Sequence, residues 1–266
     1  MMLILLLLIQ ITILMKTLGV LNGLVVTTIL LIGLILLCRF SLKMKLPKSR
    51  YSRITWEDMP WLYDGIARMA NRARIQTPTI YIEDNPIPIA YSFQNSIVLS
   101  AGLFEILDRD EILAVAAHEI GHIKNGDTFL FPLLRYGKYV MGIMTLITVF
   151  IAKNSLTSLI SVGVFLTYMV TLLRFLRKRE FKADRIALQI AEVPYALKTA
   201  LEELKFYEES MLGKDTPLPT IQPSLDRKEN NYNQQTILFS THPTYEERIA
   251  KIMSIVDMYR RLELLK

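Results

Sequence analysis

Only one charged side chain, Lys16, lies among the first 38 residues of the chain. A continuous helix of that length would extend about 57 Å, nearly twice the roughly 30 Å hydrocarbon core of a bilayer. Two membrane spans fit better than one, and we predict them at residues 1–15 and 18–38. The first is short, at roughly 22 Å, and requires local thinning of the bilayer. A cleaved signal peptide is disfavoured, because no basic segment precedes the apolar run and no small-x-small pattern follows it.

Two further apolar stretches, residues 139–152 and 156–173, are separated by three residues and predict a helical hairpin whose first arm extends back to Phe129. Basic residues flank this hairpin on one side and also follow residue 38: Arg39, Lys43, Lys45, Lys48, Arg50, Arg53, Arg135, Lys138, Arg174, Arg177, Lys178 and Arg179. By the positive-inside rule, both polar regions then face the cytoplasm. We expect a multi-pass protein of the cell membrane with four spans.

Composition supports a membrane protein. A mean hydropathy of +0.31 and a hydrophobic fraction of 52% argue against an ordinary soluble domain and against disorder. The six basic residues between positions 39 and 53 equal the whole net charge of +6. Because they directly follow an apolar run, the charge indicates a lipid surface, and no nucleic-acid partner is expected. The single cysteine, Cys38, allows no intramolecular disulfide.

The polar regions predict mainly helices with a small antiparallel β-sheet. Expected helices cover residues 57–74, 110–124, 176–191, 194–212 and 243–265, and expected strands cover residues 79–82, 90–93 and 96–100. A polar loop is expected at residues 213–235. Asp108 and Glu111 form a capping-box pattern before the second helix, and Asn125-Gly126 ends it. The chain therefore divides into a transmembrane pair (1–38), a first polar part (39–128), a transmembrane hairpin (129–175) and a second polar part (176–266).

The second polar helix contains His118-Glu119-Ile120-Gly121-His122, a His-Glu-x-x-His pattern. Residues four apart project from one helical face, so both imidazoles can bind one Zn²⁺ while Glu119 serves as general base. The alternative is a helix end with surface histidines. The apolar residues before the motif disfavour that alternative, because two buried histidines without a shared partner would be costly.

A catalytic zinc needs a third protein ligand, and Glu180 is the candidate. Glu180 and Asp184 share a helix face, so one carboxylate can bind the metal while the other accepts the free N–H of a ligating histidine. The alternative is that both are counter-ions in a basic segment next to the membrane.

Three segments of the chain resemble the HtpX-type membrane metalloproteases, relatives of the CAAX prenyl-processing and Oma-type proteases. They are Ala117–Asp127 with the His-Glu-x-x-His pattern, Arg179–Asp184, and Ser240–Pro243 followed by Glu247-Arg248-Ile249. The resemblance covers nearly the whole chain. It implies a polytopic membrane protein with a zincin-type (gluzincin) cytoplasmic protease domain that binds one Zn²⁺ per chain.

The resemblance also implies roles for single residues. His118, His122 and Glu180 would be ligands, Glu119 the catalytic base, and Asp184 a supporting residue. Arg248 is a weaker candidate for a supporting residue, since most arginines on such a helix are solvated or pair with a nearby carboxylate. His242 would stabilise the developing oxyanion or occupy the open zinc position, although plain capping of the last helix explains it as well. Where the family usually has Asn-Ala-Phe, this chain has Ile89-Ala90-Tyr91, so the polar contact of Asn to substrate is missing.

The expected reaction is peptide hydrolysis by a water that zinc activates, with Glu119 as the base. An extended substrate is expected to pair with an exposed edge strand, through one of two segments containing Ala90, Tyr91, Ser96, Ile97 and Val98. Unfolded or membrane proteins are the expected substrates, which implies a role in protein quality control. The alternatives are a prenyl-processing protease, for which the chain looks too short, and an inactive membrane adaptor that keeps the zinc fold.

Overall fold

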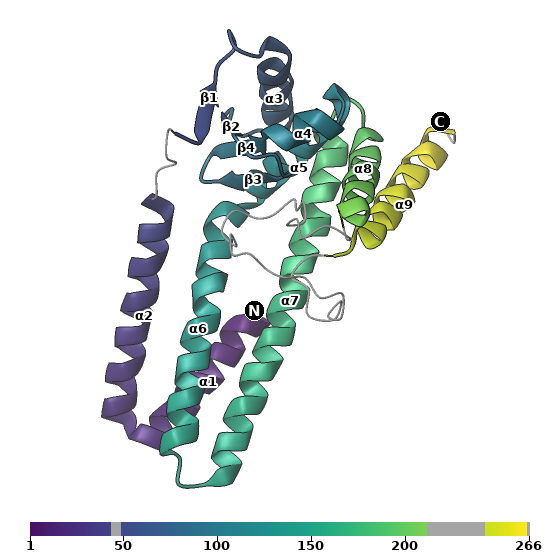
Figure 1. The fold of residues 1–266 in the computed structure, drawn as a ribbon. Helices are drawn as coiled ribbons and strands as arrows, with labels where there is room; N and C mark the ends of the chain where they lie inside the picture. Colours follow the sequence, from purple (N-terminus) through teal and green to yellow (C-terminus); the bar gives the residue numbers. More distant parts are fainter. Residues whose placement is uncertain (44–48, 212–242, 265–266) are drawn as a thin grey trace. The chain divides into compact units, whose positions relative to one another are not determined.

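The computed structural model describes residues 1–43, 49–211 and 243–264 (Figure 1). The predicted loop at 213–235 and His242 lie outside these residues. The chain forms two compact units. The first comprises Met1–Met44 and Leu130–Leu176, and the second comprises Lys45–Phe129 and Arg177–Lys266. We describe each unit by itself.

The first unit consists of apolar helices: α1 (Met2–Leu18), α2 (Val20–Lys43), most of α6 (Asp127–Ile151) and the first part of α7 (Ser155–Ile190). The first three residues of α6 and the part of α7 from Arg177 onward belong to the second unit. Among the described residues, three helices are long and apolar enough to cross a membrane, namely α2, α6 and α7. Helix α1 is equally apolar but has 17 residues, about 25 Å of helix. The protein is therefore a membrane protein, and a crossing by α1 stays a prediction.

Helix α7 runs unbroken for 36 residues. The sequence predicted an apolar arm that ends at residue 173 and a separate helix from residue 176, and this separation is wrong. The prediction ended the arm where the composition changes from apolar to polar. Arg174 and Phe175 are ordinary helix residues, however, so nothing at this point breaks the hydrogen bonds of the helix.

Close contacts hold α1 inside the first unit. A β-carbon on Gly23 of α2 would lie 2.7 Å from Cα of Met15, so the two backbones touch at that point. On another face, the buried Gln10 amide donates to the Ser161 hydroxyl of α7 at 2.7 Å. Small residues at helix contacts and polar side chains that bond across helices are the usual means of packing apolar helices in lipid.

The second unit contains a sheet of four strands among the described residues, in the order β1-β2-β4-β3 (Figure 1). Their bounds are β1 (Tyr51–Ile54), β2 (Thr79–Glu83), β3 (Ala90–Phe93) and β4 (Ser96–Ser100). The expectation of a purely antiparallel sheet is wrong, because β2 and β4 pair in parallel. The hairpin turn at Gln94-Asn95 reverses the chain, so β4 runs in the direction of β2.

Strand β4 takes an inner position beside β2, which suits a strand whose Ile97, Val98 and Leu99 are all buried. A strand that is apolar on both faces fits between two neighbours better than at an edge. Strand β3 is left as one edge of the sheet, and β1, which the sequence did not predict, forms the other.

Helices α3 (Pro60–Ala73), α4 (Ala101–Ile106), α5 (Arg109–Asn125), α8 (Ala196–Met211) and α9 (Tyr245–Leu264) complete this unit. Helix α5 is central, since it packs against α3, α8 and the sheet. Its predicted capping box is confirmed: Glu111 N donates to Asp108 Oδ1 at 2.8 Å, and Asp108 N donates to Glu111 Oε2 at 3.0 Å. Its end is confirmed at Gly126, where φ is 72°. The most buried helix of the unit is thus held at both ends.

Candidate metal centre

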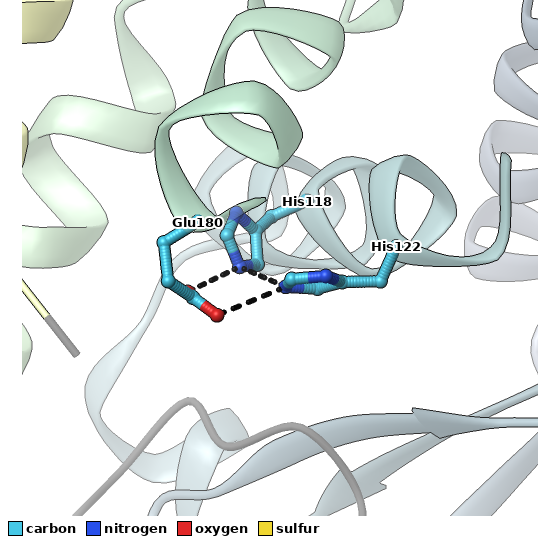
Figure 2. A group of neighbouring side chains, drawn as sticks. All are labelled: His118, His122 and Glu180. Carbon is cyan, nitrogen blue, oxygen red and sulfur yellow. Dashed lines mark hydrogen bonds and ion pairs between the residues drawn. The ribbon is translucent and has the colours of Figure 1, made fainter. Parts of the chain in front are cut away.

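Three candidate ligands converge in the second unit (Figure 2). His118 and His122 lie one turn apart on α5, with their Nε2 atoms 3.1 Å from each other. Glu180 of α7 faces both rings, because its Oε2 lies 3.6 Å from His118 Nε2 and its Oε1 lies 3.6 Å from His122 Nε2. All three side chains are buried.

A glycine between the histidines lets α7 approach. A β-carbon on Gly121 would lie 2.8 Å from the carbonyl oxygen of Ala183, closer than real β-carbons come to other atoms. Glu180 is three residues before Ala183, so the turn of α7 that touches Gly121 is also the turn that presents the carboxylate. The contact of the two backbones therefore brings Glu180 to the histidines.

The donor set fits a divalent cation. Two imidazole nitrogens and one carboxylate oxygen are the ligands of many catalytic zinc sites. A tetrahedral ion about 2.1 Å from each nitrogen would separate the two nitrogens by roughly 3.4 Å, close to the 3.1 Å observed. The cluster could therefore hold one metal ion with a position left for water or substrate.

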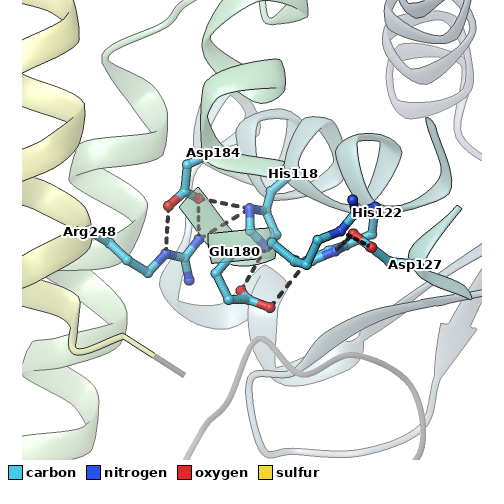
Figure 3. Close-up of polar contacts among 7 residues, drawn as sticks. His118, His122, Asp127, Glu180, Asp184 and Arg248 are labelled. Atoms are coloured by element: carbon cyan, nitrogen blue, oxygen red, sulfur yellow. Dashed lines mark hydrogen bonds and ion pairs between the residues drawn. The ribbon is translucent and has the colours of Figure 1, made fainter. Parts of the chain in front are cut away.

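Asp184 of α7 contacts Nδ1 of His118, the ring nitrogen that faces away from His122 and Glu180 (Figure 3). Asp184 Oδ1 lies 2.8 Å from His118 Nδ1, and Arg248 of α9 donates to both carboxylate oxygens of Asp184. Arg248 Nη2 also lies 3.2 Å from His118 Nδ1. Arg248 is only 4% exposed, so it forms part of the site and is not a solvated residue of the helix surface.

The charges of Asp184, Glu180 and Arg248 shift the pKa values of the site. Burial and the Arg248 charge both lower the pKa of His118, but hydrogen bonds to Asp184 and Glu180 outweigh them and raise this pKa to about 9. Burial raises the pKa of Asp184, yet the Arg248 charge and the bond to His118 lower it overall. Asp184 therefore stays ionised and can accept the Nδ1 proton, which leaves Nε2 turned toward the cluster.

His122 has its own carboxylate. Oδ2 of Asp127, the first residue of α6, lies 2.8 Å from His122 Nδ1 (Figure 3). Its Oδ1 accepts a hydrogen bond from Arg179 Nε. Sequence reasoning missed both of these residues. Arg179 was counted among the basic residues that flank the hairpin, and Asp127 was given no role beyond being the last residue of the segment Ala117–Asp127. The available signal was the five-residue spacing from His122 to Asp127 across a single turn.

The expected base, Glu119, is fully buried beside the two ligands. Among the described residues, neither carboxylate oxygen of Glu119 makes a hydrogen bond of standard geometry. Burial raises the pKa of Glu119, against the lowering effect of the two histidines and of the nearby Ser92 hydroxyl of β3. A carboxyl group with a raised pKa is suited to accept a proton and release it again near neutral pH.

The residues expected to bind substrate fall into two groups. Ala90 and Tyr91 lie on β3, an edge of the sheet. Ser96, Ile97 and Val98 lie on β4, whose two sides pair with β2 and β3, so the expectation that this segment is an open edge is wrong. The backbone of Ile89 is held by Ser100 through two hydrogen bonds, which leaves its side chain as the main difference from the family pattern.

Comparison with known proteins gives a consistent result. The model of peptidase family M48 matches residues 57–256. A protein named protease HtpX homolog from Dictyoglomus turgidum is 31% identical over 234 residues, which cover 79% of this chain and 74% of the relative. Proteins of the same name from Persephonella marina and Neisseria meningitidis are each 29% identical, covering 84% and 75% of this chain, and 83% and 74% of the relatives.

Proposed function

The chain belongs to peptidase family M48, and on this premise we propose that it is a zinc-dependent endopeptidase of misfolded or membrane-associated proteins. The family and the apolar helices make it a membrane metallopeptidase. The observation that supports zinc is the convergence of His118, His122 and Glu180, with Glu119 adjacent. Two imidazoles and one carboxylate are a usual donor set for catalytic zinc.

When bound, zinc would polarise the scissile carbonyl and lower the pKa of a water. The Glu119 carboxylate accepts a proton from the attacking water and passes it to the leaving nitrogen. Asp184 and Asp127 each face the Nδ1 atom of one histidine, so both Nε2 lone pairs point into the cluster. Because these side chains are buried, bulk water does not compete for their hydrogen bonds.

The proposed substrates follow from the edge strand. A peptide in extended conformation can add to β3 through main-chain hydrogen bonds at Ala90 and Tyr91, which requires little side-chain selectivity. Such recognition suits exposed segments of unfolded proteins. The basic residues that flank the apolar helices support a cytoplasmic position for the polar regions, and thus a role in quality control on that side of the membrane.

The substitution Glu119→Gln tests the enzyme. It removes the proton acceptor and keeps the size of the side chain, so we expect cleavage of an unfolded test protein to fall by about 10²- to 10⁴-fold with zinc content unchanged. The assay uses purified full-length protein in detergent, loaded with zinc. Glu105→Gln, at an exposed position of α4, is the matched control and should keep wild-type activity.

Equal cleavage by wild type and Glu119→Gln would refute the enzyme and favour the inactive-adaptor alternative. Cleavage only of peptides with a lipidated C-terminus would favour the prenyl-processing alternative. The variant Glu180→Ala should lose bound zinc, and zinc retained near one ion per chain would place the third ligand elsewhere.

A further inference from the structure

We infer that Asp127 and Arg179 are positioning residues for the proposed metal ligand His122. This inference rests on the proposed metal site and assigns a function to two residues that the reaction does not otherwise require. The carboxylate of Asp127 is fully buried, and its two oxygens face different partners. One lies 2.8 Å from His122 Nδ1 (Figure 3), and the other accepts from Arg179 Nε at 2.5 Å.

The bond to His122 determines which ring nitrogen is free. The Asp127 carboxylate is an acceptor placed at Nδ1, so Nε2, the atom that faces His118 and Glu180, is the nitrogen left to bind a metal. The same bond prevents the ring from rotating about its side-chain bonds. Partners of this kind commonly change metal affinity by 10- to 100-fold when they are removed.

Arg179 keeps Asp127 in place. Its Nε donates to Asp127, and its Nη2 donates to the carbonyl oxygen of Asn125 at 2.5 Å. Asn125 is the last residue of α5, and Asp127 is the first of α6, so one guanidinium bridges the junction of the two helices. It also compensates the charge of a carboxylate that would otherwise be costly to bury.

His118 has the same arrangement as His122. Asp184 faces His118 Nδ1 and accepts two hydrogen bonds from Arg248. Each of the two histidine ligands is thus in contact with a buried carboxylate, and each of these carboxylates is paired with an arginine from another helix. The repetition favours positioning over a merely structural ion pair, because a structural pair would not need to end on a ligand nitrogen.

The test is the zinc affinity of Asp127→Asn. Affinity is measured by competition with a chelator, on full-length protein in detergent. We expect binding 10- to 100-fold weaker than in wild type, because the amide must turn its N–H₂ toward either His122 or Arg179, both of which are donors. Absorption of the Co²⁺-loaded protein is a second readout, and its ligand-field bands should shift. Asp110→Asn, at an exposed position in the first turn of α5, is the matched control and should leave both readouts unchanged.

Arg179 is tested through a double-mutant comparison. Arg179→Gln should weaken zinc binding, Arg179→Lys should restore part of the loss, and Arg179→Gln combined with Asp127→Asn should be no weaker than Asp127→Asn alone. Thermal unfolding of the metal-free variants shows separately whether each of them folds.

Wild-type zinc affinity in a folded Asp127→Asn variant would overturn the inference. Losses that add in full in the double variant would also overturn it, since Arg179 would then act independently of Asp127. A wild-type protein that binds no zinc would instead refute the metal site itself.

Discussion

Gly121 lies between the two histidines, and its missing side chain determines how closely α7 can approach α5. The substitution Gly121→Ala would place a β-carbon 2.8 Å from a backbone oxygen that belongs to a helix and cannot rotate away. We expect α7 to shift by a few tenths of an ångström, at a cost of about 1–3 kcal/mol in the free energy of unfolding. Because Glu180 moves with α7, zinc affinity measured by chelator competition should fall as well.

Gly163 provides the control for this substitution. It lies in α7 itself, and a β-carbon there would meet nothing within 4 Å. Gly163→Ala should therefore keep wild-type stability and zinc affinity. If Gly121→Ala behaves in the same way, the close approach of the two backbones is not what places Glu180.

The two histidines could be predicted as a pair because their geometry is local: His118 and His122 share a face of one helix whatever surrounds it. Glu180 and Asp184 repeat that spacing, but only the resemblance indicated that this second helix meets the first. The roles of Gly121 and Arg179 could not be assigned in this way. Gly121 matters because the backbone of a distant segment approaches it, and Arg179 is 52 residues away from its partner Asp127. Each residue also has an ordinary local explanation, Gly121 as a helix residue and Arg179 as one of the basic residues that flank the hairpin.

Helix pairing in the first unit depends on another glycine. The substitution Gly23→Val would introduce a branched side chain where a β-carbon already lies 2.7 Å from Met15 Cα, so α1 and α2 must separate. We expect a loss of about 1–3 kcal/mol in stability, measured as a lower unfolding temperature in detergent. Gly33→Val, in the same helix with no atom within 4 Å of its β-carbon, should have no such effect. Equal unfolding temperatures would show that α1 does not pack on α2 through this contact.

Elements were predictable where the signals are contained in one segment, as in α5 with its capping box and its terminal glycine. Pairing between elements was not. The parallel pair β2–β4 depends on which strand of a hairpin occupies the centre of the sheet, and the turn at Gln94-Asn95 is compatible with either order. Strand β1, Tyr51–Ile54, lies within the basic segment that follows residue 38 and contains no apolar run, so its pairing with β2 becomes apparent only in three dimensions.

At the scale of the whole molecule, the distribution of basic residues predicts which side of the membrane each segment faces. The basic residues that follow residue 38 and those that flank the hairpin lie next to the polar regions. In the turn between α6 and α7, by contrast, Lys153 is the single basic residue. Charge bias of this kind sets orientation in short loops. We therefore expect residues 49–127 and 177–264 on the cytoplasmic side, and Lys153 on the opposite side.

Single cysteines test this orientation. In a Cys38→Ser background, a maleimide that cannot cross membranes should label Lys153→Cys in intact cells, and should label Glu57→Cys only after the membrane is permeabilised. Both positions are exposed in the structure, so burial cannot mask the reagent. Met2→Cys reports on α1: protection in intact cells means that α1 crosses, and labelling from outside means that it does not. Labelling of Glu57→Cys from outside would place the metal centre outside the cytoplasm, and the proposed substrates would then have to be proteins of that other compartment.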